Sequence, residues 1–194
     1  MIMPIVAYGA AVLKKKAKDL DLNDPKLPEL IANMWETMYA SHGVGLAAPQ
    51  VGLPNRLFVV DASPFADDES LDAAEANALK DFKEVFINPI MVSESGDFWV
   101  FNEGCLSIPD IREDVRRKET ITIRYYNENL EEQTRTLDGL AARVVQHEYD
   151  HIEGILFTDH LTAFKKRLLK GRLQNIAKGN IDVDYRMRFP NELK

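Results

Sequence analysis

Apolar residues recur at helical spacing in three parts of the chain. Residues 27–43 show this pattern, with Pro28 near the start and Gly43 at the end, which predicts a helix of about four turns. A second pattern covers residues 140–153, where Asp138 could cap the helix. A third covers about 163–177, and we expect its apolar side chains to face inward: Phe164, Leu168, Leu169, Leu173 and Ile176.

Shorter apolar or alternating runs in the middle of the chain predict strands. Residues 56–62 form a run typical of a buried strand, and residues 84–95 and 97–109 predict strands broken at prolines and glycines. Residues 119–137 contain two alternating runs around Asn127, which predicts a β-hairpin. The acidic, alanine-rich stretch 63–81 is predicted to be a surface excursion that could include one helical turn.

A block of strands flanked by helices is typical of an α+β fold with a mostly antiparallel sheet. We therefore predict one domain covering residues 1–194. In this domain, antiparallel β-sheets would pack around the helix at 140–153, with one further helix near the N-terminus and one near the C-terminus.

Composition and charge narrow the class of protein. The 194 residues are 45% hydrophobic and 28% charged, as in a soluble globular domain, and the formal net charge of −7 argues against bulk attraction to DNA. The single cysteine, Cys105, cannot form an internal disulfide, which indicates a reducing compartment. Lysines follow the N-terminal apolar stretch, the reverse of a secretory signal, and no apolar run approaches the roughly 20 residues of a membrane span. We predict a cytoplasmic protein that binds neither membrane nor DNA.

The segment QHEYDH, residues 146–151, places two histidines on one face of the predicted central helix. His147 and His151 could bind one cation from that face, and Glu148 lies beside them as a base for a metal-bound water. Neutral imidazole binds zinc, iron, copper or nickel. A chance match on an exposed helix is the alternative, but this match lies on an apolar face, where burying two unliganded histidines is costly.

A catalytic metal site of this kind usually has three protein ligands and an open position. Upstream, Cys105 is a candidate third ligand, because a metal-bound thiolate is deprotonated and a Cys/His/His set is a known open geometry. A lone cysteine can also be a small buried hydrophobic residue. The weaker downstream candidates are Asp159, His160, Asp182 and Asp184. A downstream ligand would favour an HExxH endopeptidase, and four protein ligands would favour a purely structural metal site.

Three segments, taken together, resemble the signature motifs of peptide deformylases: GVGLAAPQ (43–50), EGCLS (103–107) and QHEYDH (146–151). The resemblance extends from about residue 4 to about residue 175. It implies a cytosolic hydrolase that acts on nascent N-formylmethionyl peptides and removes their formyl group. It also implies one divalent metal ion, usually Fe(II) in the cell, with Zn(II), Ni(II) or Co(II) as alternatives.

The resemblance assigns the chemistry by motif position. Cys105, His147 and His151 would hold the metal, and Glu148 would be the general acid and base. A metal ion lowers the pKa of a bound water from about 15.7 toward 7 and can polarise the formyl oxygen. Glu148 would then carry the proton of the water to the departing nitrogen.

The resemblance also implies groups that bind the substrate. Gln50 and the backbone N–H of Leu106 would bind the oxyanion, and Gly45 would present its backbone to a substrate lying as an added strand. Methionine needs an apolar pocket, and the candidates for its lining are Val44, Leu140 and Val144, with Ile108 weaker. Glu103 and Arg112 complete the substrate-binding candidates, and these two could also pair with each other. Arg143, where many relatives have an apolar pocket residue, is expected to point outward or to alter the pocket rim.

The predicted C-terminal helix is strongly basic. Between residues 163 and 181 there is no acidic residue, and the six basic ones are Lys165, Lys166, Arg167, Lys170, Arg172 and Lys178. This asymmetry opposes the net negative charge of the chain. Some relatives use C-terminal helices to contact the ribosome, where basic side chains could bind RNA phosphates. A solvated helix face is the alternative.

Overall fold

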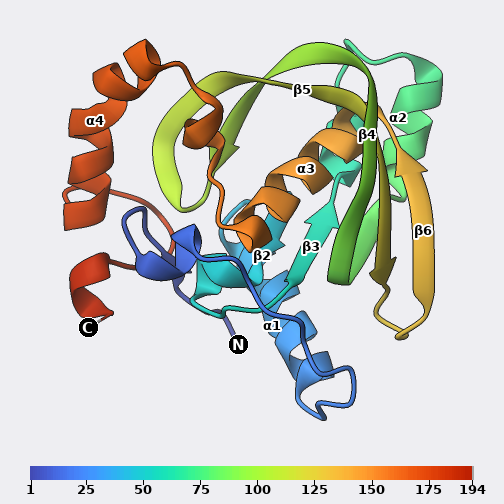
Figure 1. Cartoon of the computed structure of the whole chain (residues 1–194), viewed down its shortest axis with the longest axis horizontal. Coiled ribbons are helices and arrows are strands. Elements are labelled where there is room, and N and C mark those ends of the chain that lie inside the picture. Colours follow the sequence, from blue (N-terminus) through green and yellow to red (C-terminus); the bar gives the residue numbers. More distant parts are fainter. Residues whose placement is uncertain (194) are drawn as a thin grey trace.

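The computed structural model describes residues 1–193, and an antiparallel sheet forms its framework (Figure 1). Its five strands lie in the order in which they occur along the chain, and each is antiparallel to its neighbours. They are β2 (Gly45–Ala47), β3 (Leu57–Asp61), β4 (Lys83–Cys105), β5 (Ile108–Tyr126) and β6 (Glu132–Leu137). The predicted α+β class and antiparallel sheet are therefore confirmed.

Strand β4 is continuous, although two separate strands were predicted in its place. Pro89 and Gly96 do not end the strand, because the pairing with β5 shifts register between Ile87 and Ile90 and again between Ser95 and Phe98. Such β-bulges absorb residues that the regular ladder does not accept. The two long strands consequently form one hairpin that curves over the helix beneath it (Figure 1).

Helix α3 (Gly139–Glu153) lies under this curved hairpin and confirms the helix predicted at 140–153. Its apolar face packs into a core cluster that includes Phe58, Phe86, Val145 and Ile152. Asp138 occupies the N-cap position, but its side chain makes no capping hydrogen bond. The packing of this face, together with the left-handed cap at Gly154, fixes the direction in which the helix presents its histidines.

Helix α1 (Leu27–Ala40) confirms the N-terminal helix and ends three residues earlier than predicted. Its buried face shares a core cluster with β2 and β3, including Met34, Met38, Leu46 and Val59. The chain after α1 turns so that the N–H of Gly43 donates to the carbonyl of Met38 at 2.9 Å. This turn delivers the chain directly into β2.

Helix α4 (Ala163–Lys178) has a narrower buried face than predicted. Leu169, Leu173 and Ile176 are buried, but Phe164 is 67% exposed and Leu168 is 64% exposed. Successive helical residues are rotated by about 100°, so a stripe through 169, 173 and 176 leaves 164 and 168 off the contact. The prediction that these two side chains face inward was wrong, because α4 packs along a single narrow stripe.

The segment 63–81 is more ordered than predicted. It contains η3 (Ser63–Asp67), a 3₁₀ helix, and α2 (Ala73–Lys80), whose N-cap Asp72 accepts a hydrogen bond from the N–H of Glu75 at 2.8 Å. Leu79 of α2 is buried in the same core as α3. The segment is therefore attached to the body of the fold by its own apolar residues.

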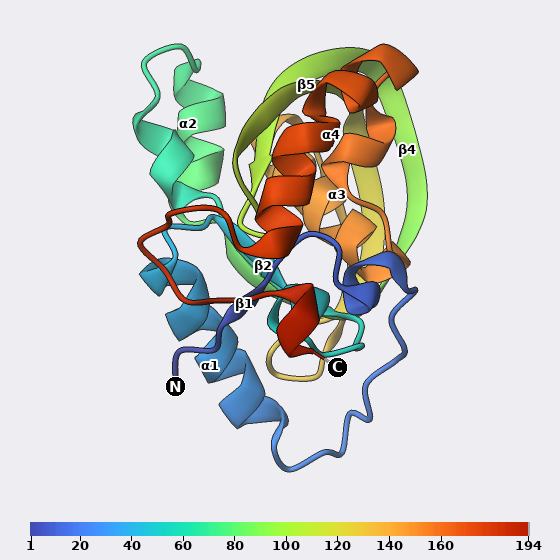
Figure 2. The same ribbon diagram turned by 90° about the vertical axis from the view of Figure 1, so that its left-hand side faces the viewer.

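Both chain termini meet in a second, small sheet. Strands β1 (Ile5–Val6) and β7 (Met187–Arg188) pair in parallel, so the segment after α4 returns to the N-terminal segment (Figure 2). The remaining 3₁₀ helices are η1 (Ala11–Lys14), η2 (Ala48–Val51), η4 (Phe157–His160) and η5 (Pro190–Glu192). Among residues 1–193, no helix combines the length and apolar character needed to cross a bilayer.

Candidate active site

Three predicted ligands converge where the end of β4 crosses α3. Atoms of Cys105, His147 and His151 that could bind a metal all lie within 4.8 Å of one another. The Sγ of Cys105 lies 3.3 Å from Nε2 of His151, and the two imidazole centroids are 5.1 Å apart. Sequence spacing predicted that the histidines share a face, and the long β4 strand brings the cysteine to that face.

This donor set fits a divalent metal ion. Zinc binds nitrogen at about 2.0–2.1 Å and sulfur at about 2.3 Å, so donors around one tetrahedral ion lie about 3.5 Å apart. Burial alone would raise the pKa of Cys105, but His151 and His147 lower it to about 5, which favours the thiolate that a metal requires. The cluster contains none of the downstream candidates: His160, for example, contacts Asp150 at 2.7 Å.

Glu148 lies beside the cluster, on the wall of a cavity. Its side chain is buried, and Oε2 has no hydrogen-bond partner among residues 1–193. Burial raises the pKa of Glu148 to about 7. A side chain at Gly45 would collide with it, because a Cβ there would lie 2.8 Å from Glu148 Cδ. Glycine at position 45 therefore allows the carboxylate to sit against β2.

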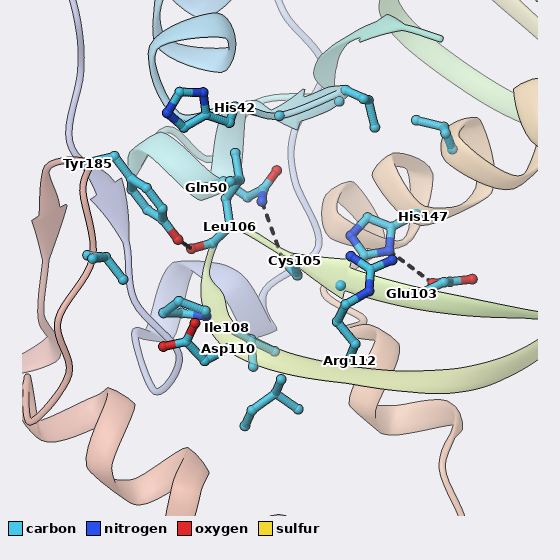
Figure 3. Close-up of a pocket in the computed structure, with 18 of the residues that line it drawn as sticks. His42, Gln50, Glu103, Cys105, Leu106, Ile108, Asp110, Arg112, His147 and Tyr185 are labelled. Carbon is cyan, nitrogen blue, oxygen red and sulfur yellow. Dashed lines mark hydrogen bonds and ion pairs between the residues drawn. The ribbon is translucent and has the colours of Figure 1, made fainter. Parts of the chain in front are cut away.

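Gln50, on η2, is oriented toward the same point (Figure 3). The N–H of Ala47 donates to Oε1 of Gln50 at 2.8 Å, and this fixes which end of the amide faces the cluster. The Nε2 group then donates to Sγ of Cys105 at 3.5 Å. Gln50 is buried, so its side-chain amide is shielded from bulk water in this orientation. The arrangement leaves a side-chain N–H donor next to the three ligands.

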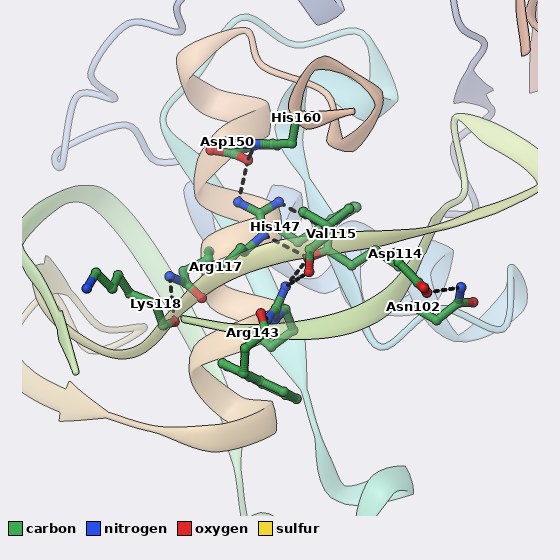
Figure 4. Close-up of polar contacts among 12 residues, drawn as sticks. Asn102, Asp114, Val115, Arg117, Lys118, Arg143, His147, Asp150 and His160 are labelled. Atoms are coloured by element: carbon green, nitrogen blue, oxygen red, sulfur yellow. Dashed lines mark hydrogen bonds and ion pairs between the residues drawn. The ribbon is translucent and has the colours of Figure 1, made fainter. Parts of the chain in front are cut away.

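A buried network of charges holds His147 (Figure 4). Nδ1 of His147 donates to Glu103 at 3.0 Å, which leaves its Nε2 free to face the cluster. Glu103 also accepts from Arg117 at 2.7 and 3.1 Å and from Arg143 at 2.9 Å. Burial would raise the pKa of Glu103, but His147 and Arg117 hold it well below its usual range. Arg117 also donates to Asp150 at 2.7 Å, which ties the network back to α3.

These contacts change three expectations from the sequence. Glu103 borders the cavity, but its carboxylate is engaged by His147 and two arginines, so we assign it to positioning the histidine and not to binding substrate. Arg112 does not pair with Glu103, because its Nε donates to Asn102 at 3.0 Å. Arg143 points neither outward nor to the rim: it is 1% exposed and donates to the carbonyl of Trp99 at 2.8 Å.

Replacing Glu103 with glutamine is expected to weaken metal binding by about 10–100-fold, the usual effect of losing a partner of a histidine ligand. Folding stability should also fall by about 3–5 kcal/mol, because the buried guanidinium of Arg143 loses its charged partner and Arg117 keeps only Asp150. Metal titration and denaturant unfolding measure the two effects. The matched control is Glu132→Gln on the exposed face of β6. Unchanged metal affinity in Glu103→Gln would contradict the positioning role.

The cavity lined by Cys105, His147 and Glu148 has a volume of about 730 Å³. Val44 and Val144 line it as predicted, and so do the aromatic rings of Phe65 and Phe101, whose centroids are 6.5 Å apart. Leu140 does not line this cavity. It is buried in the core and borders a neighbouring cavity, because it lies one turn of α3 further from the candidate ligands than Val144 does.

Sequence reasoning missed several residues around the site. Phe65 lies in the acidic tract to which no function was assigned, and only its apolar character within that tract could have indicated it. Asp150 was visible inside the QHEYDH segment, whereas nothing local indicated Arg117. At the outer edge, Tyr185 borders the cavity from the C-terminal segment. Contacts across such sequence distances have no local signature.

Comparisons with known proteins agree with one another. A family model described as "Polypeptide deformylase" matches residues 2–167. A peptide deformylase of Christiangramia forsetii is 64% identical over 194 residues, covering 100% of this chain and 99% of that protein. One of Flavobacterium psychrophilum is 58% identical, covering 97% of each. The crystal structure of a peptide deformylase from Legionella pneumophila superimposes with a TM-score of 0.77 at 34% identity, covering 93% of this chain and 98% of that chain.

Proposed function

The chain belongs to the polypeptide deformylase family, and from this we propose that it removes the N-formyl group from the formylmethionine of newly made polypeptides, releasing formate. The observation that carries the proposal is the Cys105, His147 and His151 cluster, with the buried carboxylate of Glu148 on the wall of a cavity that Cys105 and His147 also line. Amide hydrolysis needs a nucleophile, a polarised carbonyl and a proton for the leaving amine. A metal held by the cluster would serve the first two needs, and Glu148 on the cavity wall would serve the third.

Cys105, His147 and His151 would hold the metal. A divalent ion bound there would supply Lewis acidity to water and to the formyl carbonyl. Glu148 takes a proton from the attacking water and delivers it to the departing nitrogen, and its buried carboxylate on the cavity wall beside His147 supports this role.

Gln50 and the N–H of Leu106 stabilise the negative charge that develops on the formyl oxygen. Support comes from the fixed amide of Gln50, whose Oε1 is held by Ala47 while Nε2 faces the cluster. Donors that are oriented before the reaction need no reorganisation in the transition state. Both therefore act on the transition state more than on the bound substrate.

The substrate chain would lie along β2. This strand is at the edge of the five-stranded sheet, so its outer backbone groups can pair with an extended peptide. The backbone of Gly45 lies there next to Glu148. The methionine side chain would enter the apolar part of the cavity, between Val44, Val144 and the Phe65 and Phe101 rings. Arg112, also on the cavity wall, would contact the substrate backbone.

Iron is the metal that we propose for the cellular enzyme, with zinc, nickel or cobalt able to occupy the same donors. The decisive experiment is formate release from an N-formyl-Met peptide by anaerobically iron-loaded protein, with N-acetyl and unformylated peptides as controls. Formate should appear only with the formylated peptide. No formate release would contradict the proposal, and cleavage of internal peptide bonds would favour an endopeptidase.

We place this activity in the cytoplasm, where chain synthesis occurs, and propose that α4 binds the ribosome. Support for the second point is the six basic residues of α4, with no acidic residue among them, and the exposure of Phe164 and Leu168 on the same helix. Basic side chains bind RNA phosphates, and apolar side chains can pack against a protein or a base.

The triple substitution of Lys165, Lys166 and Lys170 by glutamate is expected to weaken ribosome binding by about tenfold or more at physiological salt, because exposed Lys166 and Lys170 become repulsive to phosphate and Lys165, which pairs with Glu113 at 2.7 Å, also reverses its charge. Turnover of a free formylated peptide should not change. Ribosome co-sedimentation and formate release measure the two properties. Equal co-sedimentation of the triple variant and the unmodified protein would remove α4 as the ribosome contact.

A further inference from the structure

The turn between β4 and β5 carries two groups that the proposed reaction needs. Cys105 ends β4 and pairs with Ile108 at the start of β5, so only Leu106 and Ser107 connect the strands. The turn therefore holds a predicted metal ligand and the predicted oxyanion N–H in adjacent residues. Turns at the end of a hairpin are usually the most mobile part of a sheet.

Both carbonyl groups of this turn are held by the chain termini. The hydroxyl of Tyr185 donates to the carbonyl of Leu106 at 2.8 Å (Figure 3). The N–H of Tyr8 donates to the carbonyl of Ser107 at 2.9 Å. The turn is thus bonded on one side to the C-terminal segment and on the other to the N-terminal segment.

The two terminal segments are in turn fixed to each other. Tyr185 lies two residues before β7, and the N–H of Ile5 donates to the carbonyl of Arg186 at 2.8 Å. The N–H of Ala7 donates to the carbonyl of Arg188 at 2.9 Å. This parallel pairing, seen in Figure 2, sets the position from which the Tyr185 ring reaches the turn.

We propose that Tyr185 is a positioning residue for deformylation. Its hydroxyl holds the carbonyl of Leu106, and this fixes the residue so that the backbone N–H of Leu106 points to the oxyanion. The inference rests on the proposed function. Tyr185 lies outside the range matched by the family model, so this assignment comes from its contacts alone. An oxyanion donor must lie within about 2.7–3.1 Å of the developing charge. If the turn were mobile, its N–H would therefore stabilise the oxyanion much less.

Tyr185→Phe tests the proposal by removing only the hydroxyl. We expect kcat to fall by about 3–10-fold, the effect of losing one neutral hydrogen bond, with KM nearly unchanged. Hydrogen exchange should quicken in the peptide that covers residues 105–108 and stay the same in α3. The matched control is Tyr126→Phe, since Tyr126 is a half-buried tyrosine at the far end of β5. Metal content should be equal in all three proteins.

Two results would overturn the proposal. One is unchanged kcat together with unchanged exchange at residues 105–108 in Tyr185→Phe. The other is faster exchange throughout the protein, which would make the hydroxyl a general stability contact. Failure of the unsubstituted protein to release formate would instead contradict the proposed function, and the exchange measurement would still report on the turn.

Discussion

Replacing Glu148 with alanine is expected to lower kcat by about 10²–10⁴-fold, the usual contribution of a general acid and base. The carboxylate is buried beside the proposed metal ligands, which is where the proposed proton transfer takes place. The fold should persist, because Oε2 makes no hydrogen bond to residues 1–193 that the substitution would break. Formate release by metal-loaded protein measures the loss.

Glu148→Gln is the matched variant, since it keeps the shape of the side chain and removes the ability to accept a proton. It should be as inactive as Glu148→Ala, while both variants keep their metal and their thermal unfolding midpoint within a few degrees. A Glu148→Ala protein with full activity would refute the general-base assignment. Loss of metal in both variants would show that the carboxylate is needed for metal binding and not for proton transfer.

Cys105→Ser is expected to produce the second large effect, on metal binding. Removing the partner of a ligand typically lowers metal affinity by about 10–100-fold, so removing a direct thiolate ligand should lower it further. A serine hydroxyl stays protonated at neutral pH and is a poor replacement for a thiolate. Metal content after dialysis, measured beside formate release, should show protein that is mostly metal-free and inactive.

His160→Gln is the control for Cys105→Ser. His160 was a candidate third ligand, but the structure places it against Asp150. Its replacement should leave the metal bound. If Cys105→Ser kept its metal and His160→Gln lost it, the third ligand would lie downstream, and the alternative of an HExxH endopeptidase would be favoured.

Local sequence patterns predicted the elements that carry the site better than the contacts that complete it. The helix at 140–153 follows from its period, and the four-residue spacing of His147 and His151 already requires a shared face. The pairing of Glu103 with Arg117 and Arg143 has no such signal, because the three residues come from two strands and a helix. Of the three, only Arg143 was expected to point outward or to the rim, and only the fold shows that the three charges compensate one another when buried.

The misjudged elements have a similar origin. The spacing of apolar residues in a sequence does not indicate how wide the buried stripe of a helix will be. For this reason Phe164 and Leu168 of α4 were predicted to face inward. Proline and glycine mark both strand ends and bulges, so β4 was predicted as two strands. Phe65 was passed over because the residues around it are acidic, yet the structure places it on the wall of the site cavity.

The parallel pairing of Ile5 with Met187 joins residues from nearly opposite ends of the chain. During translation β1 leaves the ribosome first. It can pair with β7 only after the residues between the two strands have been made. Chains that end between residues 152 and 184 would contain all three proposed metal ligands and lack the hydroxyl that holds the Leu106 carbonyl. We therefore expect the Leu106 turn to gain its contact with Tyr185 only after the segment that follows α4 has been made.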